Sequence, residues 1–132
     1  MSAKFDMVGV FVINIERMVT FYRDVLGFEI EWQLGSPYAE FKNQNMRASF
    51  YERRLLPELL GQQPGYPTGL NGTFELALDF PSYADVDREF ERVVALGARS
   101  IYVPRNEPWG MRSSMIADPE GNLIEIGSWN KG

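Results

Sequence analysis

Apolar and polar residues in the first half of the chain alternate in an order that predicts one strand, one helix and three more strands. Residues 7–13 form a continuous run rich in β-branched and aromatic side chains, which is typical of a buried strand. Asn14 can cap a helix, and apolar residues at helical spacing continue from Ile15 to Leu26 before Gly27 favours a left-handed stop. Further strands are predicted at residues 28–32, 38–42 and 46–51.

The same order returns in the second half of the chain. Residues 74–80 predict a strand, Ser82 and Asp85 resemble a capping box, and helical spacing then continues to Gly97. The remaining elements are strands at residues 100–103, 111–117 and 123–128, with a turn over residues 118–122. A repeat of about 70 residues is too long for a solenoid and predicts two modules paired about a pseudo-twofold axis.

A segment rich in proline and glycine separates the two repeats, and residues 54–60 are its only predicted helix. We therefore expect a single domain over residues 1–132. Within it, module one spans about 5–52, the linker about 53–73 and module two about 74–130.

Composition removes many kinds of chemistry. The 132 residues include no histidine and no cysteine, which excludes a histidine base, an imidazole or thiolate metal site and a cysteine nucleophile. An enzyme with this sequence must work with carboxylates, tyrosine, arginine or lysine. The net charge of −5 has the wrong sign for binding nucleic acid.

The sequence shows no targeting or membrane segment. The apolar stretch near the start lacks the length and cleavage site of a signal peptide, and no run reaches the roughly 18 apolar residues of a membrane span. We expect a cytoplasmic protein with no membrane partner.

Two segments carry a resemblance to a known family. Residues 21–28, Phe-Tyr-Arg-Asp-Val-Leu-Gly-Phe, and residues 117–126, Ala-Asp-Pro-Glu-Gly-Asn-Leu-Ile-Glu-Ile, resemble motifs of the glyoxalase/bleomycin resistance protein/dioxygenase superfamily, also called vicinal oxygen chelate (VOC). The resemblance implies an α+β fold in which two paired βαβββ modules form a curved mixed sheet around a cleft, commonly in a homodimer. Residues 108–112 look closer to the bleomycin-resistance branch than to the metal-dependent isomerases.

The resemblance also implies where a metal would be held. The four ligand positions of the family's metal enzymes fall on Met7, on Ala48 or Ser49, on Glu75 and on Glu125. Two carboxylates without imidazole can hold Mg²⁺ or Mn²⁺ weakly, but not Zn²⁺ or Ni²⁺ tightly. We therefore expect no resident metal cofactor.

Strand alternation places Glu125 on the face opposite Ile124 and Ile126, and Glu75 on the same face as Ala77. The two carboxylates could share a proton or hold a cationic ligand, or face solvent as ordinary strand residues. The expected ligand-binding residues are Trp109, Arg112, Glu75, Glu125, Tyr51, Phe50, Trp32 and Tyr102. Trp109 could instead cover the core, and Arg112 could instead pair with Glu107 or Asp118.

Three functions follow from these observations. The leading hypothesis is a protein that binds a small cationic or aromatic organic molecule without a catalytic metal, as antibiotic-sequestering members of the family do. The alternative is a glyoxalase-type lyase or isomerase in which Glu125, with Glu75 and weakly held Mg²⁺ or Mn²⁺, removes a proton beside a carbonyl. The third is an interaction module without a ligand, which no positive feature of the sequence supports.

Overall fold

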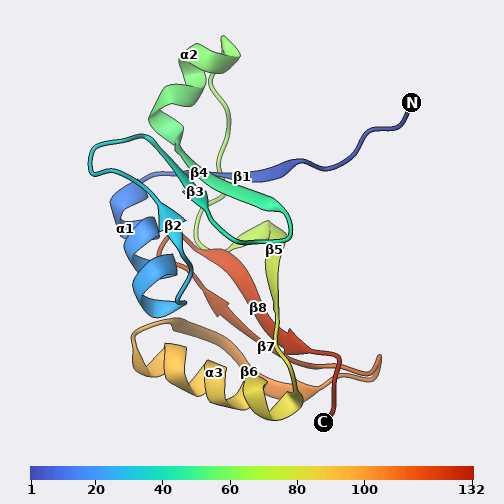
Figure 1. Ribbon diagram of the computed structural model, residues 1–132. Helices are drawn as coiled ribbons and strands as arrows, with labels where there is room; N and C mark the ends of the chain where they lie inside the picture. Colours follow the sequence, from blue (N-terminus) through green and yellow to red (C-terminus); the bar gives the residue numbers. More distant parts are fainter. The chain divides into compact units, whose positions relative to one another are not determined.

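Each half of the chain folds into a βαβββ module whose four strands form one mixed sheet (Figure 1). The computed structural model describes residues 1–132 and divides them into two compact units, Met1–Tyr66 and Pro67–Gly132. The division lies inside the predicted linker, residues 53–73. The predicted fold class, α+β with two βαβββ modules, is confirmed.

The first sheet has the strand order β1-β4-β3-β2, in which β1 runs parallel to β4 and the other pairs are antiparallel. Its elements are β1 (Met7–Val12), α1 (Ile15–Thr20), β2 (Ile30–Glu31), β3 (Tyr38–Phe41) and β4 (Arg47–Glu52). The connection to the second unit begins with a short 3₁₀ turn (Arg53–Leu55) and α2 (Leu56–Leu60), which matches the single helix predicted in the linker.

The first helix begins as predicted but ends differently. The Asn14 side chain accepts a hydrogen bond from the Arg17 amide at 3.0 Å and caps α1. After α1 the chain widens into a π-helical turn (Phe21–Val25) instead of continuing as an α-helix. In this turn the consecutive residues Phe21 and Tyr22 are both buried, and the centre of the Tyr22 ring lies 5.1 Å from the centre of the Phe50 ring.

The second sheet repeats this topology with longer strands, in the order β5-β8-β7-β6. Its elements are β5 (Asn71–Asp79), α3 (Tyr83–Ala95), β6 (Arg99–Asn106), β7 (Arg112–Ala117) and β8 (Asn122–Ser128). The Ser82 side chain caps α3 by accepting from the Asp85 amide. Strand β5 begins three residues before the predicted start because buried Asn71 pairs with Asn122 of β8.

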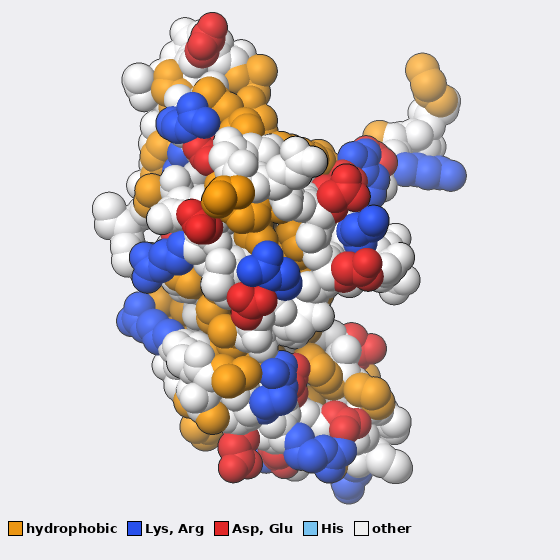
Figure 2. Space-filling view, turned by 60° about the vertical axis from the view of Figure 1, so that its left-hand side comes forward, with side chains coloured by type: hydrophobic (Ala, Val, Ile, Leu, Met, Phe, Trp, Pro, Cys, Tyr) orange, Lys and Arg blue, Asp and Glu red, His pale blue; other side chains and the backbone are white.

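Helix α3 covers one face of the second sheet and packs on β6, β7 and β8. The core between them includes Val86, Phe90, Ile116, Ile124 and Ile126, all buried. The solvent side of α3 carries Arg88–Asp85 and Arg92–Glu89 ion pairs. Figure 2 shows acidic and basic side chains intermingled over the surface that it draws. No helix of the protein is long and apolar enough to span a membrane.

Candidate functional site

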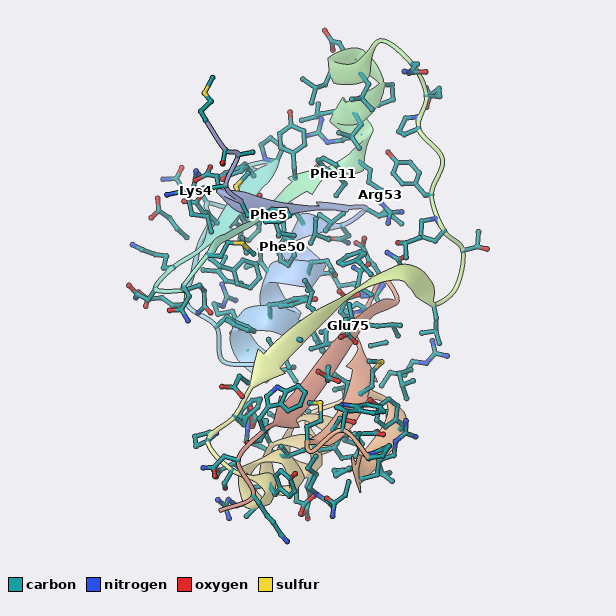
Figure 3. The ribbon with its side chains drawn as sticks, turned by 90° about the vertical axis from the view of Figure 1, so that its right-hand side faces the viewer. Lys4, Phe5, Phe11, Phe50, Arg53 and Glu75 are labelled. Atoms are coloured by element: carbon teal, nitrogen blue, oxygen red, sulfur yellow. The ribbon has the colours of Figure 1, made fainter.

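The face of the second sheet opposite α3 carries the two carboxylates that the sequence singled out. Glu125 of β8 pairs with Ala77 of β5 and with Met115 of β7, whereas its neighbours Ile124 and Ile126 are fully buried on the α3 side. The alternating exposure of β5 places Glu75 on the same face as Ala77. The predicted placement of both carboxylates is confirmed, and Figure 3 shows Glu75 on β5, the strand that pairs with β8.

Glu125 is partly buried and has no counter-ion. Burial raises the pKa of the Glu125 carboxyl above its usual value, and the negative charges of Glu75 and Glu107 raise it further. Neither Glu75 nor Glu125 forms an ion pair or a side-chain hydrogen bond. The face therefore holds negative charge that no basic side chain compensates.

A third carboxylate, Glu107, differs from Glu125 because it has hydrogen-bond donors. Its Oε1 atom accepts hydrogen bonds from Arg105 Nε at 2.6 Å and from Ser113 Oγ at 2.9 Å. These two donors, Arg105 first, lower the pKa of the Glu107 carboxyl. Glu107 is thus stabilised as a carboxylate, whereas Glu125 is destabilised as one.

Tyr102 joins this arrangement from the edge strand β6. It pairs with Met115 of β7, its hydroxyl lies 3.1 Å from Ser113 Oγ, and the Arg105 guanidinium carbon lies 4.0 Å from the centre of its ring. We call the surface that carries Glu75, Tyr102, Glu107, Ser113 and Glu125 the acidic face. Of these, Tyr102 is half-buried and Ser113 is fully buried.

The loop between β6 and β7 brings a further group toward Glu125. A hydrogen bond of 2.7 Å from the Glu107 amide to the Met111 carbonyl closes this loop, and Trp109 at its tip is 59% exposed. A Cβ atom added to Gly127 would lie 2.6 Å from Met111 Cε and 3.7 Å from Glu125 Cδ. Met111 and Glu125 therefore flank the same point over β8, with Gly127 leaving the room between them.

Arg112 and Phe50 do not lie where a ligand-binding role requires, and we correct both expectations. Arg112 donates to Asp87 at 2.9 Å and to Asn106 at 2.9 Å, so its ion pair uses neither Glu107 nor Asp118. Because successive strand residues point to opposite faces, Arg112 lies on the α3 side while Ser113 lies on the acidic face. Phe50 is fully buried in the core of module one.

The remaining predicted aromatic residues belong to module one. Tyr51 is half-buried on the sheet face opposite Phe50, with its ring centre 6.4 Å from that of Phe11 in an edge-to-face contact (Figure 3 labels Phe11 and Phe50). Trp32 follows β2, and its indole N–H donates to the Ser36 carbonyl at 2.9 Å. The indole hydrogen of Trp32 is therefore already used within its own loop.

A comparison of the strand registers in the two modules identifies the residue of β4 that corresponds to Glu125. Ser49 pairs with Gly9 of β1 in the way that Glu125 pairs with Ala77 of β5, whereas Ala48 pairs with Val8 on the other face. With this register, the positions at which the family resemblance predicts metal ligands are Met7 and Ser49 in module one, and Glu75 and Glu125 in module two. No group of three or more histidine, cysteine, aspartate or glutamate side chains that could hold a metal ion forms in the structure.

Comparisons with known proteins place these observations in context. A family model described as the Glyoxalase/Bleomycin resistance protein/Dioxygenase superfamily matches residues 4–126. The chain is 27% identical over 125 residues to the uncharacterized protein YraH of Bacillus subtilis (strain 168), covering 93% of this chain and 96% of that protein.

Solved structures show the same fold. A glyoxalase/bleomycin resistance protein/dioxygenase from Nocardioides matches with a TM-score of 0.82 and 22% identity, over 100% of this chain and 87% of that chain. A family enzyme from Burkholderia phytofirmans PsJN matches with a TM-score of 0.80 and 25% identity, over 96% and 98% of the two chains.

Proposed function

This chain belongs to the Glyoxalase/Bleomycin resistance protein/Dioxygenase superfamily, and on that premise we propose that it binds a small, positively charged organic molecule on the acidic face of module two, without a catalytic metal. The use resembles that of the bleomycin-resistance branch, whose antibiotic-sequestering members bind their ligand without transforming it. The exposed Trp109 supplies an aromatic surface against which such a ligand can stack.

The observation that carries this proposal is the uncompensated charge of Glu125. A partly buried carboxylate without a basic partner costs free energy in the empty protein, and a bound cation recovers that cost. Glu75 on the neighbouring strand adds a second negative charge to the same face. The attraction is Coulombic, so it weakens as salt concentration rises.

Removing Trp109 tests the aromatic part of the proposal. We expect Trp109→Ala to weaken the binding of protonated phenethylamine at pH 7 by about fivefold, since aromatic pairs contribute about 0.5–1.5 kcal/mol beyond area burial. Isothermal titration calorimetry at low and high salt measures both the affinity and its electrostatic share. Trp129→Ala is the matched control, because Trp129 is 64% exposed and lies outside the β6–β7 loop. Equal affinities of the Trp109 and Trp129 variants would remove Trp109 from the site.

One observation favours a second function, a glyoxalase-type lyase or isomerase. The surroundings raise the pKa of Glu125 and lower the pKa of Glu107, so Glu125 is the more basic carboxylate and the better proton acceptor of the two. The similar protein from Burkholderia phytofirmans is described as an enzyme. In this reading Glu125 takes a proton from the carbon beside a carbonyl group, the electron pair of the broken C–H bond passes into an enolate, and Glu125 then returns the proton to the enolate at a neighbouring atom. Glu107 stays ionised throughout.

Metal titration separates a metal-free binding protein from an enzyme in which Glu125 and Glu75 hold Mg²⁺ or Mn²⁺. We expect chelator-treated protein to show no saturable rise in melting temperature with Zn²⁺, Ni²⁺, Mg²⁺ or Mn²⁺, because binding to the native state alone would raise it. The Glu75→Gln, Glu125→Gln double variant is measured in parallel. A change in melting temperature that persists in this variant comes from ions bound elsewhere on the surface. A saturable shift that is present in the wild type and lost in the double variant would favour a metal-dependent enzyme.

A further inference from the structure

The hydrogen bonds on the acidic face run in one direction only. Ser113 carries a single hydroxyl hydrogen, and the Glu107 carboxylate beside it at 2.9 Å can only accept, so Ser113 donates to Glu107. With that hydrogen used, Ser113 can only accept from Tyr102 at 3.1 Å. The chain therefore runs from the Tyr102 hydroxyl through Ser113 to Glu107.

The Nε–H group of Arg105 is directed at the same carboxylate. Arg105 donates from Nε to Glu107 at 2.6 Å, and its guanidinium covers one side of the Tyr102 ring at 4.0 Å. The hydroxyl hydrogens of Tyr102 and Ser113 are spent within the protein. What Glu75, Glu125 and the Tyr102 hydroxyl offer a ligand are oxygen lone pairs, and all of these are acceptors.

We propose that Tyr102 acts as a hydrogen-bond acceptor that selects ligands carrying a hydroxyl or N–H donor at a distance from their positive charge. The inference rests on the proposed function, since Glu125 supplies the site for the cation. Tyr102 and Glu125 both pair with Met115, one from each side, so about two strand spacings, roughly 10 Å, separate their backbones. The ligand class is an aryl-alkyl amine with a distal donor; an ether or carbonyl oxygen at that end is disfavoured.

A matched pair of amines tests this selectivity. Tyramine and its O-methyl ether are both cations at pH 7, but only tyramine can donate a hydrogen bond from its distal oxygen. We expect the wild-type protein to bind tyramine about fivefold more tightly in calorimetric titration, the value of one ordinary hydrogen bond. A ratio near one in the wild type would overturn the proposal.

Ser113→Ala supplies the decisive variant because it frees the Tyr102 hydroxyl hydrogen. Tyr102 can then donate to the ether oxygen, so we expect the O-methyl ether to bind more tightly than before and the ratio to fall toward one. Ser114→Ala is the control: Ser114 is equally buried but donates to the Ile126 carbonyl on the α3 side, so the ratio should not change. An unchanged ratio in the Ser113 variant would overturn the proposal.

Tyr102→Phe keeps the test valid if the Ser113 variant fails to fold. It should lower tyramine affinity to that of the ether, and an undiminished preference for tyramine in this variant would contradict the proposal. A further outcome separates this proposal from the proposed function. If Glu125→Gln weakens the binding of both amines, but the ratio of tyramine to ether affinity is the same in the Ser113 and Tyr102 variants as in the wild type, the proposed function stands and the selectivity proposed for Tyr102 is wrong. Absence of binding by either amine to the wild type would overturn both.

Discussion

Replacing Gly121 by alanine should destabilise the protein by about 4 kcal/mol, more than a typical single substitution. Gly121 has φ +87°, which costs an L-residue with a side chain about 1–2 kcal/mol. The added Cβ would also lie 2.3 Å from the Gly69 carbonyl oxygen and 3.2 Å from its carbon, so the backbone itself would have to move.

Gly121 lies in the turn between β7 and β8, and a change in this turn also affects the acidic face. The Asn71 amide donates to the Gly121 carbonyl at 2.8 Å, which ties the start of β5 to the turn that begins β8. Glu75 and Glu125 lie on these two strands, so displacement of the turn disturbs their register.

Urea unfolding followed by circular dichroism measures the effect. Gly35→Ala is the matched control, because Gly35 has φ +89° but nothing lies within 4 Å of its added Cβ. This variant should lose only the conformational cost of about 1–2 kcal/mol. If the two variants lost similar amounts of unfolding free energy, the backbone at Gly69 would move away from the added Cβ without destabilising the fold.

The sequence predicted those features of the site that depend on local alternation. Glu75 and Glu125 were placed on their face correctly because burial alternates regularly around them, over residues 74–79 of β5 and residues 122–126 of β8. The repeat of strand and helix patterns likewise predicted the two modules and their element order. These features depend on neighbours in the sequence, which the pattern reports directly.

Features that depend on strand pairing were not predicted. The β6–β7 pairing shifts between Ser100 and Tyr102 and again between Tyr102 and Arg105, so alternation could not place the groups that follow. Glu107 was therefore seen only as a partner for Arg112, and its link to Ser113 was missed. Ser113 could have been placed from its spacing to Met115, but nothing local indicated its partners.

The errors at Arg112 and Phe50 have a similar origin. Sequence proximity suggested Glu107 and Asp118 as partners for Arg112, whereas the observed partner, Asp87, comes from α3, 25 positions earlier in the chain. Phe50 and Tyr51 are adjacent aromatic residues of which one must face the core, and only the pairing of Ala39 with Phe50 in β3 and β4 identifies which. Packing between distant segments decides both cases.

Replacing Glu125 by glutamine should stabilise the fold at pH 7 while weakening the binding of a cationic ligand by about tenfold, the effect of roughly 1.4 kcal/mol of lost attraction. The pKa of Glu125 is raised in the folded protein, mainly by burial, so the ionised carboxylate lowers the free energy of unfolding at neutral pH. A neutral amide removes that penalty and also removes the charge that attracts the ligand.

The sign of the pH dependence follows from the same shift. As pH falls through the raised pKa of Glu125, the folded wild type takes up a proton before the unfolded chain does, and its stability rises toward that of the variant. The difference in melting temperature should therefore be largest near pH 7 and vanish below about pH 4, where the carboxyl is protonated in both states. Ligand affinity of the wild type should fall over the same range.

Melting curves and titrations with protonated phenethylamine between pH 4 and pH 8 measure both effects on one protein. Glu91→Gln is the control, because it removes the same charge from an exposed position on α3. The Glu91→Gln variant should differ from the wild type in melting temperature and in affinity for phenethylamine by much less than the Glu125→Gln variant does. A Glu125 variant that lost stability at pH 7 would contradict the assignment of Glu125 as an uncompensated charge. If the same variant still bound the amine with wild-type affinity, Glu125 could not be the group that attracts the cation. Removing the charge of a partly buried carboxylate that faces a bound cation must weaken the binding of that cation.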